Sequence, residues 1–337
     1  MENALGGCTF IAFAYVFSLY LIPSHIRAKG RDDAVHIRYR MWASSMATAL
    51  SMVGVVAYFY VYEVSKEGFT IPQSLGLRLD TLMGAIVRTA VLMGIFYAGP
   101  ALTFLCTLYS IGFSDIDYEG RTLVRKDAGL ATSSLRDASR ARLDFLKNLW
   151  GSFAAEDPLI FYRNLVFAPF TEEVAFRALM LPLLHEAFTC ARGWSSEEVS
   201  MLNPIFFSLA HLHHVYEKLR SGQTVKMALL STLLQASYTA IFGFIAALLL
   251  VRTGNLGAPL TAHVICNFMG LPDTGFFFPP GHPNSTRLSF LYPYRHFHCL
   301  VHILGLFLFS HCLSELLYPF AVNNPFLECK SIYLKYT

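Results

Sequence analysis

The stretch NLVFAPFTEEVAFRALMLPLL, residues 164 to 184, places three ionisable side chains inside a segment that otherwise has the composition of a buried helix. The three residues are Glu172, Glu173 and Arg177. In a membrane, each such charge costs about 3 kcal/mol or more, so these residues normally face a cavity or a charged partner. The stretch therefore predicts a helical membrane protein with a polar site inside it.

The rest of the chain has a membrane composition. Of 337 residues, 54% are hydrophobic and 15% are charged. Four segments contain no Asp, Glu, Lys or Arg and are each long enough to cross a bilayer: residues 4–22, 42–61, 89–113 and 227–251. Four further apolar segments are interrupted by charge, His or Pro: residues 159–190, 201–214, 256–271 and 300–320. We expect an all-α, polytopic helical bundle of roughly eight transmembrane helices, forming a single membrane domain over residues 1–337.

The charges predict an orientation and exclude one class of partner. The loop after the first span carries five basic residues: Arg27, Lys29, Arg31, Arg38 and Arg40. Because basic loops stay in the cytosol, we place this loop and the loop 114–158 on the cytosolic side. The net charge of +3 gives no support for nucleic-acid binding.

Helical spacing separates the two adjacent glutamates. Glu173 and Arg177 are four residues apart and share a face, so the arginine can neutralise that carboxylate. Glu172 is turned by about 100° from Glu173. A carboxylate in apolar surroundings without its own cation is a stronger base, which suits general-base chemistry. The alternative interpretation is an ion pair that only stabilises the helix.

Two other apolar segments carry polar groups at helical spacing. Phe207 and His211 share one face in FSLAH, and His263 and Asn267 share one in HVICN. An imidazole N–H and an amide NH₂ directed at one point are suited to stabilising a tetrahedral oxyanion. The residues thus predict both a base and an oxyanion site.

Together these motifs resemble those of the type II CAAX prenyl endopeptidases, a family within the CAAX prenyl protease superfamily. The chain has EExxxR in TEEVAFRALMLP, FxxxH in FSLAH and HxxxN in HVICN, with SYTAIFG between the last two and GNLGAPLTAH leading into the third. The resemblance covers residues 161–272, which we take as the catalytic core segment.

The resemblance implies a glutamate-dependent intramembrane protease. Such an enzyme removes the C-terminal aaX tripeptide from prenylated CAAX proteins, Ras-type small GTPases among them, at the endoplasmic reticulum membrane. Its site faces the cytosolic side, where membrane lipid holds the prenyl anchor. The resemblance assigns water activation to Glu172 and His211 and the oxyanion site to His263 and Asn267. It assigns supporting positions to Glu173, Arg177 and Phe207, and it implies no cofactor.

Three alternatives remain open at this point. A zinc-dependent form could use Glu172, His211 and His263 as ligands, although HEAFT at residues 185–189 lacks the second His of a zinc-protease helix. A thiol mechanism would use Cys266, three residues after His263. A non-protease transporter or scaffold would use the carboxylates for proton coupling or structure, but the sequence shows no second copy of the motifs, as an inverted repeat would require.

Overall fold

The computed structural model describes residues 2–62, 69–110, 143–144, 146–147, 157–284, 286, 288–317 and 324–327. Every regular element within these residues is a helix, so the predicted all-helical class is confirmed for this part of the chain. Most of the loop 114–158, predicted to be cytosolic, lies outside the described residues.

Three helical stretches are long and apolar enough to cross a membrane: 34–61, 225–253 and 289–317. A fourth exists if α5 (Leu82–Phe96) and the following helix, bent by 65° between them, form one broken span. The predicted number of about eight is not confirmed. The other apolar segments form shorter helices, because charge, proline or π-helical turns interrupt them; α11 (Ser196–Ala210) has 15 residues and α14 (Gly257–Met269) has 13.

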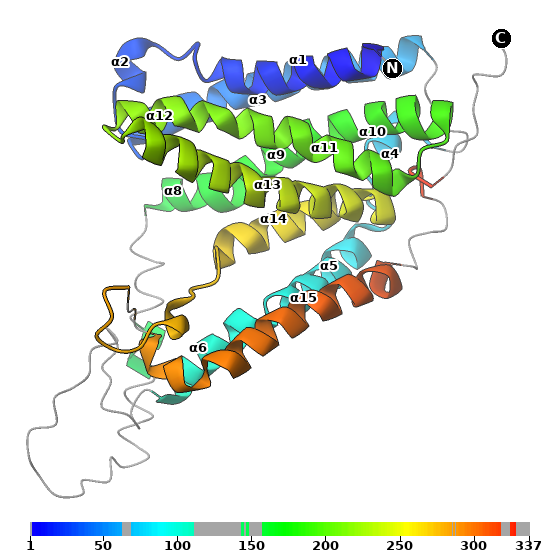
Figure 1. The fold of residues 1–337 in the computed structure, drawn as a ribbon. Helices are drawn as coiled ribbons and strands as arrows, with labels where there is room; N and C mark the ends of the chain where they lie inside the picture. The colour runs from blue at the N-terminus through cyan, green and yellow to red at the C-terminus, as the bar shows by residue number, and fades with distance from the viewer. Residues whose placement is uncertain are drawn as a thin grey trace, which may run out of the picture. The chain divides into compact units, whose positions relative to one another are not determined.

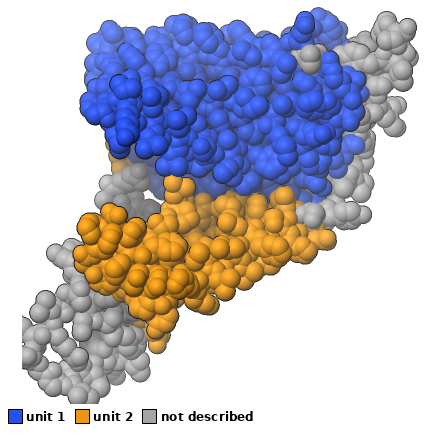
Figure 2. Space-filling view, viewed as in Figure 1, with its two compact units in different colours: residues 1–90, 159–268, 316–337 blue, residues 91–158, 269–315 orange. Residues whose placement is uncertain are grey.

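The chain divides into two compact units, coloured separately in Figure 2. The first contains residues 1–90, 159–268 and 316–337, and the second contains residues 91–158 and 269–315. All seven predicted site residues belong to the first unit. The single membrane domain expected from the sequence stays a prediction.

Polar caps fix where the helices of the first unit begin and end. Asp33 accepts hydrogen bonds from two backbone amides at the start of α3 (Ala34–Val61). Ser195 and Glu198 form a capping box at the start of α11. α13 (Val225–Thr253) ends at Gly254, whose φ of 60° is the left-handed conformation that glycine adopts without strain.

The core of the first unit lies around α10 (Met180–Leu184). Met180, Leu181 and Leu184 are fully buried. α1 (Glu2–Ser18) contacts α10 and lies along α3, while α11 and α13 run side by side (Figure 1). The apolar residues of α10 follow the charged motif in the sequence and are enclosed by neighbouring helices. This packing holds the motif in a fixed position.

The second unit is built mainly from α6 (Ala98–Ser110) and α15 (Arg295–Leu317). Gly305 of α15 lets the helix approach the α5–α6 bend, since a Cβ there would lie 2.9 Å from the carbonyl oxygen of Ile95. Thr103 and His298 are 3.3 Å apart through Oγ1 and Nδ1. No predicted site residue lies in this unit.

Candidate active site

The helix that carries the charged motif alternates between α-helical and π-helical turns. Its π-helical segments are η1 (Arg163–Phe167), η2 (Val174–Leu179) and η3 (His185–Cys190). Wide turns of this kind are rare and occur often at functional sites. Within η2, the carbonyl of Phe176 accepts a hydrogen bond of 2.6 Å from Asn203 Nδ2 of α11. The sequence, interpreted as a regular helix, did not predict these turns.

Glu173 is the paired carboxylate of the motif. It ends α9 (Ala168–Glu173), and its Oε1 lies 3.1 Å from Arg177 Nη1. The same oxygen lies 2.7 Å from His263 Nδ1 of α14. Both side chains of the Glu173–Arg177 pair are 0% exposed. The pairing predicted from the spacing is therefore present, and it occurs in a fully desolvated position.

Arg177 is enclosed by aromatic rings as well as by its carboxylate partner. Its Cζ lies 4.3 Å from the ring centroid of Phe207 and 5.6 Å from that of Phe242. Stacking of this kind stabilises a guanidinium through the ring quadrupole. Gly243 makes room for it, because a Cβ at that position would lie 3.3 Å from Arg177 Nη2. The FxxxH motif thus supplies a ring that holds the cation of the EExxxR motif.

Glu172 has a different environment from its neighbour. Its side chain is 22% exposed, and its Oε2 lies 3.8 Å from His263 Nε2. Together with Phe207 and His211, it lines a cavity of about 180 Å³. The motif therefore contains one carboxylate buried with a cation and one that faces an open cavity.

His211 lies at the end of α11, where the helix tightens into η4 (His211–His213). Its Nδ1 lies 2.7 Å from the carbonyl oxygen of Phe207. Because a carbonyl can only accept, Nδ1 carries the proton and Nε2 of the neutral ring keeps a lone pair. The FxxxH spacing therefore orients the imidazole so that its basic nitrogen is Nε2.

His263 links the two glutamates. Its Nδ1–H donates to Glu173, and the opposite nitrogen is the one nearest Glu172. The ring also lies 4.8 Å from the ring centroid of Phe242. With Nδ1–H donated to Glu173, a proton on Nε2 is present only when the ring is an imidazolium ion. In the neutral ring, the imidazole N–H donor expected from the sequence is therefore directed at Glu173.

Asn267 lies one turn after His263 on α14 and is exposed. Its Nδ2 donates to the backbone carbonyl of Asn164 at 3.0 Å. Asn164 itself lines the cavity that contains Glu172. Asn267 is thus attached to the cavity wall through a backbone contact, rather than to the carboxylates directly.

The chain is similar to known proteins over most of its length. The family model for type II CAAX prenyl endopeptidases, Rce1-like, matches residues 154–269. CAAX prenyl protease 2 of Arabidopsis thaliana is 32% identical over 280 residues, which is 81% of this chain and 81% of that protein. CAAX prenyl protease 2 of Homo sapiens is 30% identical over 273 residues, 79% of this chain and 70% of the human protein.

The chain belongs to the type II CAAX prenyl endopeptidase family. CAAX prenyl protease 2 of Saccharomyces cerevisiae is 37% identical over 113 residues, 33% of this chain and 36% of that protein. No solved structure matches the chain. Membership of the family indicates a membrane protease with CAAX prenyl endopeptidase activity, for which the substrates are prenylated CAAX proteins.

The residues that a zinc-dependent form would use, Glu172, His211 and His263, do not have their ligand atoms gathered within 4.8 Å of one another. Among the described residues, one group of His, Cys, Asp or Glu has three ligand atoms within 4.8 Å of one another: His213, His214 and Glu217. Glu217 is already engaged, since its Oε2 lies 2.9 Å from His214 Nδ1 and its Oε1 lies 3.1 Å from Arg40 Nη1. Burial alone would raise the pKa of Glu217, but the hydrogen bond with His214 and the charge of Arg40 hold it below its ordinary value.

Sequence interpretation missed several residues that line the site cavity. Arg31, Arg40 and Arg163 lie in its wall with Asn164. Arg31 and Arg40 belong to the basic segment 27–40, from which the sequence predicted only the orientation of the chain. Arg31 and Arg40 are more than a hundred residues away from the motif, so no spacing within one helix could place these two at the site.

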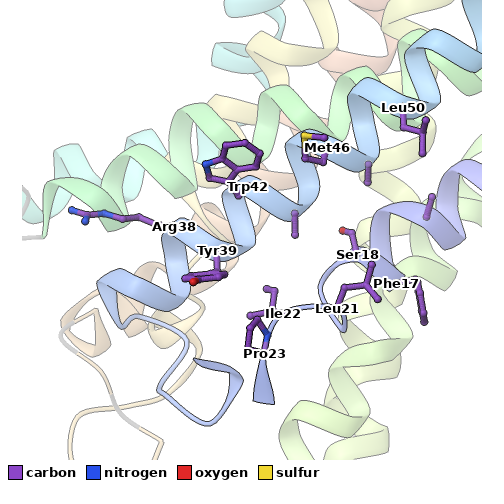
Figure 3. Close-up of a pocket in the computed structure, with 13 residues that line it drawn as sticks. Phe17, Ser18, Leu21, Ile22, Pro23, Arg38, Tyr39, Trp42, Met46 and Leu50 are labelled. Carbon is purple, nitrogen blue, oxygen red and sulfur yellow. The ribbon is translucent and has the colours of Figure 1, made fainter. Parts of the chain in front are cut away.

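A separate groove of about 890 Å³, larger than the site cavity, lies between α1 and α3 (Figure 3). Phe17, Leu21, Trp42 and Met46 are among its mostly apolar lining residues, and none of the motif residues lines it. Arg38 lines this groove, whereas Arg40, two residues further along α3, lines the site cavity. Residues two apart on a helix point to nearly opposite sides, so the two hollows lie on different faces of α3.

Proposed function

We propose that this protein is an intramembrane endopeptidase that removes the C-terminal aaX tripeptide from prenylated CAAX proteins, Ras-type small GTPases among them. One observation carries the proposal: Glu172 and His211, from separate helices, line one cavity, and His263 bridges Glu172 and Glu173. The site thus contains a carboxylate that faces the cavity (Glu172), an oriented imidazole (His211) and a hydrogen-bond donor (His263). Amide hydrolysis requires groups of these kinds to activate a water and to stabilise the oxyanion.

In the proposed reaction, a water molecule in the cavity attacks the amide that joins the prenylated cysteine to the first aliphatic residue. A cavity of about 180 Å³ is far larger than a single water needs. Glu172 takes a proton from the water as its oxygen bonds to the carbonyl carbon, and His211 Nε2 accepts the second hydrogen bond and orients the nucleophile. The proton then passes to the leaving nitrogen as the C–N bond breaks.

His263 and Asn267 stabilise the negative charge that develops on the carbonyl oxygen. With Nδ1–H donated to Glu173, His263 supplies an Nε2–H as an imidazolium ion. In that form, the charges of Glu172, Glu173, Arg177 and His263 sum to zero, which avoids a net charge in an apolar interior. Glu173, Arg177 and Phe207 act as positioning residues.

The proposed location is the endoplasmic reticulum membrane, with the site toward the cytosol. The basic segment 27–40 supports the orientation, since Arg31 and Arg40 belong to that segment and also line the cavity. A prenylated substrate held in the cytosolic leaflet would present its peptide at the same side.

The test uses purified full-length protein in detergent and a farnesylated CAAX peptide, with release of the tripeptide measured by mass spectrometry. We expect release by the unmodified protein and a loss of about 10²- to 10⁴-fold in Glu172→Gln and His211→Ala, the range for general-base catalysis. Glu2→Gln, an exposed glutamate at the start of α1, is the control. Undiminished release by Glu172→Gln would overturn the assignment of the base, and ion flux in vesicles without any release would favour the transporter.

Metal dependence is tested on the same active preparation by elemental analysis. We propose a metal-free reaction, so activity should survive a chelator. Stoichiometric zinc, together with activity that a chelator removes and added zinc restores, would replace the metal-free scheme with the zinc-dependent alternative.

A further inference from the structure

Three arginines share the cavity that contains Glu172 and His211. They come from three elements: Arg31 precedes α3, Arg40 lies within α3, and Arg163 begins η1. A cavity lined by several cations attracts an anion, because the charges are close together and partly removed from water. The proposed general base needs no such cluster, so the arginines require another explanation.

Two of the three arginines already have acidic partners. Arg40 Nη1 lies 3.1 Å from Glu217 Oε1, and Arg163 Nη1 lies 2.8 Å from Asp32 Oδ1. Arg31 forms no ion pair with any residue that the structure describes. Its backbone is nevertheless fixed, because its carbonyl oxygen accepts a hydrogen bond of 3.2 Å from Arg163 Nη1. The guanidinium of Arg31 is therefore a cation with available donors on a positioned loop.

The electrostatic environment of Arg31 is consistent with an anion site. Partial loss of water contact and then the positive charge of Arg40 lower the pKa of Arg31 from its ordinary value, although the residue as a whole is exposed. A guanidinium keeps its charge under such conditions and binds a carboxylate through two parallel N–H donors. A carboxylate ligand would offset the repulsion between the neighbouring arginines.

The proposed substrate carries such a group at a fixed position. A peptide cleaved three residues from its end has its terminal carboxylate about 10 Å beyond the scissile bond when extended. Aliphatic residues between the two supply no charge, so the terminal carboxylate is the anion nearest the reaction. An enzyme that releases a tripeptide of defined length benefits from a contact that locates the end of the chain.

Resting on the proposed function, we infer that Arg31 binds the terminal carboxylate of the substrate, while Arg40 and Arg163 maintain the positive environment around it. This contact positions the scissile amide over Glu172 and His211 and selects for a free C-terminus. The competing ligand for the same cation is the phosphate of a membrane lipid, which would bind without regard to the peptide terminus.

The experiment compares two farnesylated CAAX peptides that differ only at the end, one a free acid and the other an amide. Full-length protein in detergent should cleave the acid with a kcat/KM about 10- to 100-fold higher, or about 1.4–2.8 kcal/mol. Arg31→Ala should lose most of this preference by raising KM for the acid, and its rate on the amide should not change. Arg31→Lys should retain part of the preference because it keeps the charge without the paired donors.

Arg38→Ala is the matched control, because it also removes one arginine charge seven residues along the chain, but Arg38 lines the groove of Figure 3 and not the site cavity. We expect it to leave both peptides unaffected. Equal cleavage of acid and amide by the unmodified protein would overturn the inference alone, as would an equal loss on both peptides in Arg31→Ala, the result expected for a lipid or structural role. Cleavage of neither peptide would overturn the proposed function and this inference with it.

Discussion

Removing the guanidinium of Arg177 should destabilise the first unit far more than removing an exposed arginine. In Arg177→Met, the Glu173 carboxylate keeps only His263 as a partner, and both members of the original pair are 0% exposed. Loss of one partner of a buried pair costs about 3–5 kcal/mol. The remaining contact with His263 places our expectation at the lower end, about 3 kcal/mol.

The exposed control is Arg252→Met. Its partner is Glu197, with 39% and 44% of the two side chains exposed, and such pairs contribute about 0.2–1 kcal/mol. For a unit of about 220 residues, a loss of 3 kcal/mol lowers Tm by roughly 6 °C, against 2 °C or less for the control. Thermal unfolding of the purified variants in one detergent measures both.

A double substitution tests the physical reason for the effect. Glu173→Gln combined with Arg177→Met removes both charges, so it should recover part of the lost stability, because no uncompensated carboxylate remains buried. Equal Tm shifts for Arg177→Met and Arg252→Met would refute the reasoning. A double variant that loses the sum of the two single effects would show that the charges do not interact across the pair.

Three further predictions concern other parts of the first unit. Asn267→Ala should lower kcat by about 10²- to 10³-fold in the peptide assay if the amide is an oxyanion donor; a loss of tenfold or less would leave it a packing role. Gly243→Ala should lower Tm by an amount equivalent to about 1–3 kcal/mol, since its Cβ would lie 3.2 Å from a proline carbon, whereas Gly54→Ala, with nothing within 4 Å, should not. The pKa of Glu217 is lower in the folded protein than in the unfolded chain. The ionised carboxylate therefore stabilises the fold at a pH above the ordinary carboxyl pKa, and this stabilisation is lost as the pH falls below about 4. Tm measured against pH should therefore fall less steeply in Glu217→Gln, and parallel curves would contradict this.

The sequence was enough to predict which side chains of a single helix share a face. The spacing of four residues pairs Glu173 with Arg177, and the neighbouring position of Glu172 gives it a different environment, as the structure shows. The number of membrane spans was less predictable, because π-helical turns within residues 158–190 alter the helix without changing its composition. Hydropathy averages over such turns and cannot detect them.

The sequence by itself determined the helical class, the two unlike carboxylates and the family, because these depend on composition and on spacing within one segment. Only the tertiary structure decided that His263 donates to Glu173, which lies 90 positions away, and that Arg31 and Arg163, 132 positions apart, meet at one cavity. Helical periodicity fixes the direction of a side chain about its own axis. The neighbour that it meets depends on how separate helices pack, which is a property of the whole set of buried contacts.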